Sequence, residues 1–117
     1  MPELLLPVPL HPTRLRERGF NQALVLARQL GSCLRIPVVA EALARSCHTP
    51  PQRGLSAAER KHNLRGAFAL QGNLAAYGAI ALVDDVVTTM STMREIARVL
   101  WRAHPQLELH VWCIARA

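Results

Sequence analysis

The chain of 117 residues is half apolar and 19% charged, and it carries a net charge of +6. This length suits a single domain with one hydrophobic core, and the apolar fraction is too high for intrinsic disorder. The three cysteines include no closely spaced pair. This argues against a disulfide framework and favours small buried thiols in a reducing cytosol. No apolar run approaches the roughly 18 residues of a membrane span, so we expect a cytoplasmic protein without membrane insertion.

The positive charge lies mainly in the first half of the chain. Residues 14–65 hold ten of the fourteen Arg and Lys residues against three acids, whereas residues 66–117 carry four of each sign. Such asymmetry indicates an anionic partner, either a nucleic-acid backbone or a phosphorylated small molecule. Arginine can bind the phosphates of either partner through two parallel hydrogen bonds. The simpler alternative is a solvated basic face.

The first half of the chain predicts two strands around one helix. The apolar run 4–10 predicts a strand, and residues 13–20 predict a loop. Helical spacing from 21 to 34 predicts an amphipathic helix. Its buried stripe is expected to consist of Ala23, Leu26, Ala27, Leu30 and Leu34. The stretch 36–44 favours a second, short strand.

A long polar segment, 46–65, follows and is interrupted by Pro50, Pro51 and Gly54. It predicts a mobile loop with one or two helical turns near 57–63. A structureless loop of this length in a small domain is usually functional or disordered.

The second half predicts strand, strand, helix and strand. Residues 66–70 favour a third strand, and 79–83 form an unbroken apolar run, as in a strand buried on both faces of a parallel sheet. A helix is predicted over 92–103, and a last strand over 107–117. On the helix, Met93, Ile96, Ala97 and Leu100 should face inward, Arg94, Arg98 and Arg102 should form a solvated face, and Trp101, like Trp112, should have a packing role. The order of elements predicts an α/β fold with helices on a mostly parallel sheet.

The only two aspartates, Asp84 and Asp85, stand at the end of the clearest strand. Ligands of open α/β sheets bind beyond the carboxyl ends of the strands. Four hydroxyl side chains follow and lead into the predicted helix, namely Thr88, Thr89, Ser91 and Thr92. Backbone amides at a helix N-terminus bind anions readily, so this pattern predicts a phosphate cradle. The simpler alternative is an ordinary helix cap by Ser91 or Thr92.

Carboxylates beside a phosphate need a separate reason, and hydrogen bonds from the vicinal hydroxyls of a ribose supply one. At this point "IALVDDVVTTMST" resembles the motif with which type I phosphoribosyltransferases bind phosphoribosyl pyrophosphate (PRPP). The segments "VPLHPTRLRERGFNQALVLARQL" and "TPPQRGLSAAERKHNLRGAF" resemble the competence protein F (ComF) family, also described as GntX-like or amidophosphoribosyltransferase-like. The resemblance runs from about Leu6 to Ala117.

The resemblance implies a single type I phosphoribosyltransferase-like domain over 1–117, with a mostly parallel central sheet flanked by helices. The cysteine-rich zinc segment with which the family usually begins has no counterpart here. Asp84 and Asp85 would be the catalytic pair that holds the ribose hydroxyls. The 5-phosphate would lie on Thr88, Thr89, Met90, Ser91 and Thr92. The pyrophosphate would meet Arg14, Arg16, Arg18 and Gly19, together with Arg53, Arg60 and Lys61 of the covering loop 46–65. Mg²⁺ would be bound mainly through PRPP, and the histidines share no spacing that predicts a protein metal site.

One position departs from the resembled motif. Met90 stands where the motif has glycine, and a methionine in a left-handed conformation would cost about 1–2 kcal/mol. Its side chain could also crowd the phosphate. No segment resembles a site for the accepting base or amine, so the second substrate and the retention of transfer activity stay open.

Two functions follow from these observations. The first is a phosphoribosyltransferase-like protein that binds PRPP or a similar phosphorylated ribose and is linked to natural competence and DNA uptake. The second is a non-catalytic module of the competence machinery, which contacts single-stranded DNA or a partner protein through the basic half. A homodimer, common among related transferases, is compatible with both.

Overall fold

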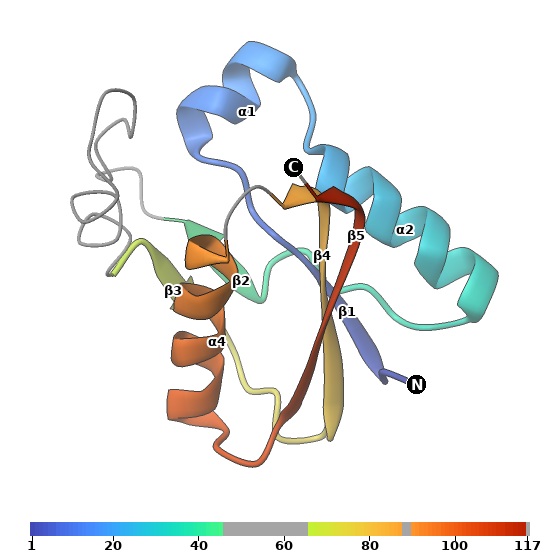
Figure 1. Ribbon diagram of the computed structural model, residues 1–117, viewed down its shortest axis with the longest axis vertical. Coiled ribbons are helices and arrows are strands. Elements are labelled where there is room, and N and C mark those ends of the chain that lie inside the picture. The colour runs from blue at the N-terminus through green and yellow to red at the C-terminus, as the bar shows by residue number, and fades with distance from the viewer. Residues whose placement is uncertain (46–65, 88–89, 117) are drawn as a thin grey trace.

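The computed structural model of the chain describes residues 1–45, 66–87 and 90–116 (Figure 1). Its elements are β1 (Leu4–Pro7), α1 (Pro12–Arg18), α2 (Gln22–Leu34), β2 (Leu43–Arg45), β3 (Phe68–Leu70), β4 (Ala79–Val87), α4 (Ser91–Ala103) and β5 (Glu108–Arg116). In the part of the chain that the structure describes, no helix combines the length and apolar character needed to cross a membrane.

The described strands form two separate sheets. β1, β4 and β5 make a parallel sheet with β4 in the middle, in which Leu4 pairs with Ile80 and Ala79 with Glu108. β2 and β3 pair antiparallel as a second sheet, with Arg45 opposite Phe68. The predicted α/β class with a mostly parallel sheet is therefore confirmed, although β2 and β3 do not join that sheet.

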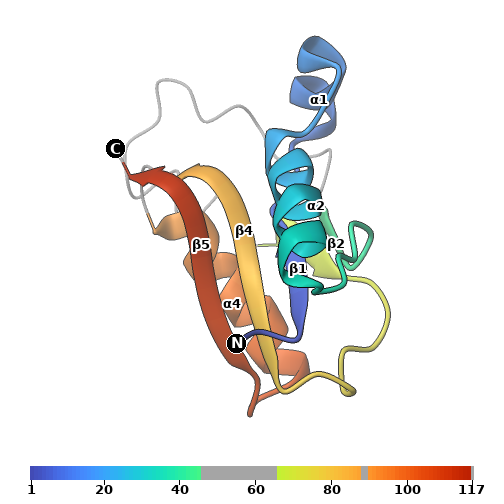
Figure 2. The ribbon, with the colours of Figure 1, turned by 90° about the vertical axis from the view of Figure 1, so that its right-hand side faces the viewer.

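Helices cover both faces of the parallel sheet (Figure 2). Because alternate residues of a strand point to opposite faces, Leu5, Ala81 and Val83 pack with α2 in one cluster. Leu4, Leu6, Ile80 and Leu82 pack in the other cluster with α4 and with residues of β2 and β3. Residues 79–83 are buried on both faces, as their unbroken apolar character predicted.

The start of α2 is fixed to the end of β1 by one side chain. Asn21 caps the helix, because its Oδ1 accepts the Ala23 N–H at 3.0 Å, and its Nδ2 donates to the Val8 carbonyl at 3.1 Å. The predicted helix is confirmed, with Ala23 and Ala27 buried. Leu34 is 42% exposed, so its place in the buried stripe is wrong. The chain turns away directly after it, where Arg35 adopts a φ of 56°.

Residues 12–18 form helix α1, so the prediction of a loop over 13–20 is wrong. Pro12 occupies the first helical turn, the His11 ring accepts the Thr13 N–H, and Gly19 ends the helix with a φ of 80°. These are ordinary start and stop features of a helix. No residue of α1 is buried, which explains why it carries no apolar stripe.

The second strand lies later than predicted. β2 begins at Leu43, and within 36–44 Val38 forms only an isolated bridge to Leu5. The third strand is confirmed as β3. The predicted loop 46–65 and its helical turns lie outside the described residues. Cys33 is exposed and Cys113 half-buried, so the expectation of buried thiols is wrong for these two.

Helix α4 presents the predicted faces. Met93, Ile96 and Leu100 are buried, Ala97 is half-buried, and Arg94, Arg98 and Arg102 are exposed. Trp101 differs from its expected packing role, since it is 45% exposed.

Candidate functional site

The two aspartates lie within β4 rather than after it. The strand continues to Val87, and Asp84 pairs with Cys113 of β5. Both aspartates are half-buried, and the Asp85 N–H donates to Oδ1 of Asp84 at 2.9 Å. The acids therefore occupy the carboxyl-terminal part of the central strand, which is the part of a parallel sheet where ligands bind.

The environment of Asp84 favours its neutral form. Burial raises the pKa of Asp84 to about 7 from 3.8, and the side chain of Asp85 contributes in the same direction. The positive charge of Arg45 acts against this increase. Two adjacent carboxylates in a half-buried place do not both ionise easily. Hydrogen-bond donors or cations bound to the pair would stabilise the ionised form.

Arg45 is a site residue that the sequence did not reveal. It ends β2, and its guanidinium lies 5.3 Å from the centre of the Phe68 ring. Burial lowers the pKa of Arg45, the charge of Arg14 lowers it further, and Asp84 raises it. Its Nε–H is buried and donates to no acceptor among the described residues. Arg45 thus stands within electrostatic reach of both Asp84 and a predicted pyrophosphate residue, Arg14.

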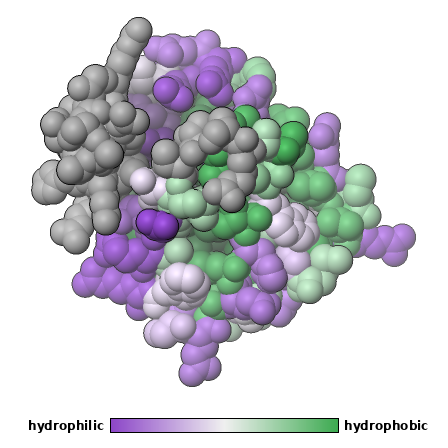
Figure 3. All heavy atoms as spheres, viewed as in Figure 1, coloured by the Kyte–Doolittle hydropathy of each residue, from purple (hydrophilic) through white to green (hydrophobic). Residues whose placement is uncertain are grey.

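The predicted pyrophosphate residues lie on or beside α1. Arg14, Arg16 and Arg18 are exposed on this helix, and Gly19 ends it. Arg18 donates to the side chain of Gln22 at 3.4 Å rather than to an acid. Their expected loop is thus a short helix, which in the space-filling view forms part of the hydrophilic surface at the top of the molecule (Figure 3). Arg53, Arg60 and Lys61 lie outside the described residues.

The predicted phosphate cradle is described in part, because Thr88 and Thr89 lie outside the described residues. Met90 is the N-cap of α4, and none of the described side chains caps this helix end. The alternative of a cap by Ser91 or Thr92 is therefore wrong. Met90 has a φ of −84°, so the left-handed strain expected from a methionine at this position does not arise. Its side chain packs against the core cluster of α4.

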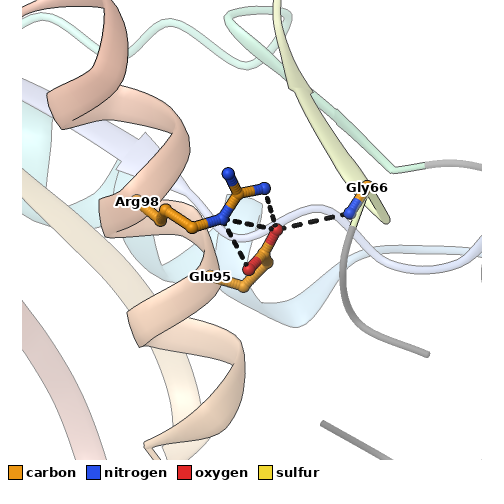
Figure 4. A network of polar contacts seen from close by, with 3 residues as sticks. All are labelled: Gly66, Glu95 and Arg98. Atoms are coloured by element: carbon orange, nitrogen blue, oxygen red, sulfur yellow. Dashed lines mark hydrogen bonds and ion pairs between the residues drawn. The ribbon is translucent and has the colours of Figure 1, made fainter. Parts of the chain in front are cut away.

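A second feature missed in the sequence is the carboxylate of Glu95, which is buried in α4. Its Oε1 accepts the Gly66 N–H at 3.3 Å, and Arg98 donates to both carboxylate oxygens at 2.6 to 3.2 Å (Figure 4). Gly66 is the first described residue after 46–65. Glu95 therefore joins α4 to the start of the chain segment that forms β3.

The described residues contain no group of three or more His, Cys, Asp or Glu side chains arranged to hold a metal ion. The acid pair offers carboxylate oxygens, which are donors that Mg²⁺ accepts. Mg²⁺ commonly keeps most of its coordination sphere for waters and substrate phosphates. The donors present thus fit an ion that arrives with a phosphorylated ligand.

Comparison with known proteins finds relatives that are similar over the full length of this chain. The chain is 45% identical over 119 residues to competence protein F of Haemophilus influenzae, covering all of this chain and 52% of that protein. It is 41% identical to the DNA utilization protein YhgH of Escherichia coli K12 and 39% identical to that of Salmonella typhi, covering 99% of this chain and 50% of each relative. The chain therefore spans about half the length of these relatives. No family model and no solved structure matches it. The similarity covers the full length of this chain and about half of each relative, and it supports the assignment of the chain to the competence protein F family.

Proposed function

We propose that this chain is a PRPP-binding domain of type I phosphoribosyltransferase-like architecture that acts in DNA uptake during natural competence. The observation that carries the proposal is the acid pair Asp84–Asp85 on the central strand, within electrostatic reach of Arg45 and just before the N-terminus of α4. The names of the relatives, competence protein F and DNA utilization protein, support the biological setting.

Each part of PRPP would meet chemistry suited to it. Asp84 and Asp85 would accept hydrogen bonds from the ribose hydroxyls. The 5-phosphate would lie at residues 88–92, where the amides at the start of α4 are capped by none of the described side chains and favour an anion. The pyrophosphate would contact Arg45 and Arg14, whose mutual repulsion an anion would relieve. Arg16, Arg18, Arg53, Arg60 and Lys61 stay predictions as further contacts.

The chemistry that this arrangement would serve is substitution at C1 of the ribose. The C1–O bond breaks, and its electron pair leaves with pyrophosphate while the acceptor forms its own bond to C1. Arginines would neutralise charge that develops on the leaving group, and the carboxylates would favour positive charge that develops on the ring. Mg²⁺, bound mainly by PRPP oxygens, would supply further charge neutralisation.

The alternative is a non-catalytic module that contacts single-stranded DNA or a partner protein through the basic half. The observation that favours it is the exposure of Arg14, Arg16 and Arg18 along one short helix. The two functions predict different ligands. PRPP should compete with single-stranded DNA or with the partner protein only if both ligands contact the arginines of α1.

Titration calorimetry with PRPP, with and without Mg²⁺, tests the proposal. We expect saturable 1:1 binding by the parent chain and loss of binding in the variant with Asp84→Asn and Asp85→Asn. Arg28→Gln on α2 is the matched surface control and should bind as the parent does. Absence of binding by a folded parent, or equal binding by the double variant, would overturn the proposal. Single-stranded DNA would then be the next ligand to titrate.

A further inference from the structure

The outer surface of α4 combines three arginines with an exposed tryptophan. Arg94, Arg98, Trp101 and Arg102 surround Ala97 and line a shallow hollow of about 620 Å³. We call this surface the α4 basic face. Hydrophilic side chains gather at the lower left of the space-filling view, which is the region of α4 in Figure 1 (Figure 3). The proposed PRPP site uses none of these four side chains.

Trp101 is exposed but fixed in orientation. Its Nε1–H donates to the Leu107 carbonyl at 2.7 Å, while 45% of the residue remains accessible to solvent. An indole held in this way loses little conformational freedom when a planar group stacks on it. Tryptophan is enriched at interaction surfaces, where one end of the side chain is apolar and the other makes a hydrogen bond.

The arginines form a row on the same face. Arg94, Arg98 and Arg102 are four residues apart, so successive arginines lie about 6 Å apart along the helix axis. Glu95 holds Arg98 with a contact of 2.6 Å and raises the pKa of Arg98, which keeps it charged. The ion pairs of the described residues include neither Arg94 nor Arg102. Arg94 and Arg102 therefore add positive charge to the hollow that the indole also lines.

We propose that the α4 basic face binds single-stranded nucleic acid, with a base stacked on Trp101 and phosphates on Arg94 and Arg102. Surfaces that bind single strands combine a basic track with aromatic rings on which bases stack. The basic first half of the chain has the charge but no such interleaved aromatics. An acidic peptide would use the arginines and leave the fixed indole without a partner, so charge and ring together favour the nucleic acid.

A single-tryptophan protein provides the direct measurement. Trp112→Phe leaves Trp101 as the only indole in the chain. Titration with oligo(dT) should quench its fluorescence to saturation, because a stacked base contacts the ring. The logarithm of the binding constant should fall linearly with the logarithm of salt concentration, by about 0.7 per neutralised phosphate. Binding without any change in the emission of Trp101 would overturn the proposal.

Paired variants then test the residues. In the single-tryptophan protein, Arg94→Gln with Arg102→Gln should weaken oligo(dT) binding at least tenfold at low salt and reduce the salt slope by about 1.4. The control variant carries Arg28→Gln in α2 and Arg35→Gln directly after it, which removes the same charge from exposed positions. Its salt slope should equal that of the parent within experimental error. Trp101→Leu, in the chain that retains Trp112, should weaken binding about 5- to 100-fold.

Circular dichroism establishes whether each variant is folded. If Trp101→Leu does not fold, the variant with Arg94→Gln and Arg102→Gln tests whether this face binds oligo(dT). Equal binding by the Arg94 and Arg102 variant and by the parent would overturn the proposal. So would displacement of oligo(dT) by polyglutamate at the same charge concentration, because that result would assign the face to acidic peptides.

Discussion

The Glu95 carboxylate and the Gly66 amide are joined by a hydrogen bond of 3.3 Å that connects two layers of the fold. Glu95 belongs to α4, which begins shortly after β4, the strand of Asp84 and Asp85. Gly66 leads into β3, and β3 pairs with β2, the strand that ends at Arg45. The bond therefore helps to set the distance between the two halves of the candidate site.

Glu95→Ala removes this connection and the fork to Arg98. We expect the free energy of unfolding to fall by about 1.5–3 kcal/mol, because the Gly66 amide loses a charged acceptor in a half-buried place. Urea denaturation followed by circular dichroism measures the change. Arg98→Gln is the control and should cost less than Glu95→Ala, since the Gly66 bond is kept and glutamine can still donate one hydrogen bond to the Glu95 carboxylate. Equal losses for the two variants would show that the Gly66 bond contributes little.

Asp84→Asn should make the protein more stable at alkaline pH. The pKa of Asp84 is about 7 in the folded chain against 3.8 as its ordinary value. The folded state therefore binds more protons between these values, and the free energy of unfolding falls as the pH rises from about 4 to 7. Asparagine does not titrate, so the variant lacks this loss of stability with rising pH. With allowance for solvent screening, the variant should exceed the parent by about 1–2 kcal/mol at pH 8 and match it near pH 4. Thermal unfolding at both pH values measures the difference, and a less stable variant at pH 8 would contradict the expected pKa.

Arg45→Gln tests the residue that the sequence concealed. If Arg45 contacts the pyrophosphate, loss of a charge-assisted hydrogen bond should weaken PRPP binding about 10- to 100-fold. Arg35→Gln, at an exposed position, should leave the affinity unchanged. Calorimetry with PRPP and Mg²⁺ gives both values. Parent-like affinity in the Arg45→Gln variant would remove Arg45 from the site.

Met90→Gly should lower stability without improving the affinity for PRPP. Met90 has a φ of −84° and packs against the core, so glycine relieves no strain there and removes apolar contact. A decrease of about 1–2 kcal/mol in the free energy of unfolding is expected for a half-buried side chain. Chemical denaturation and PRPP titration of the same samples check this. Tighter PRPP binding by the glycine variant would show that the methionine side chain does crowd the phosphate.

Gly31→Ala should destabilise the chain although it raises helix propensity. A Cβ at Gly31 would lie 2.6 Å from the Ile36 carbonyl oxygen and 2.8 Å from Cγ2 of Val38. The resulting displacement should cost about 1–3 kcal/mol, more than the gain of about 1 kcal/mol from helix propensity. Ser32→Ala is the neighbouring control, because Ser32 is exposed. In thermal unfolding, Gly31→Ala should have a lower Tm than the parent and Ser32→Ala a higher one. A stabilised Gly31→Ala variant would refute the close approach.

Apolar pattern alone predicted the elements that have a buried face. The α2 stripe, the unbroken run 79–83 and the inward side of α4 all appear in the sequence because core packing needs them. Helix α1 escaped notice because it buries nothing and so leaves no periodic pattern. Its ends did carry signals, with Pro12 in the first turn and Gly19 beyond the last. In the stretch 36–44 only the last two residues belong to a strand, β2, and Ile36 and Val38 are apolar because they pack beside α2.

The candidate site was predictable only where its residues are neighbours in sequence. Asp84 and Asp85 were identified as candidates because they directly follow the unbroken apolar run 79–83. Arg45 lies in a separate sheet, and only tertiary structure brings it to Asp84, so no local pattern could reveal it. The φ of Met90 likewise depends on how α4 packs. The roles of Asp84, Asp85 and the arginines toward PRPP stay predictions.

The parallel pairing of β1 with β4 also has a consequence for synthesis. Leu4, Leu5 and Leu6 are fully buried, but their strand partners begin at Ile80. At ribosomal rates of about 5–20 residues per second, these leucines remain without their partner strand for roughly 4–15 seconds. The nascent chain thus presents this apolar stretch well before it can complete the sheet. Chaperones that bind short apolar segments have their opportunity in that interval.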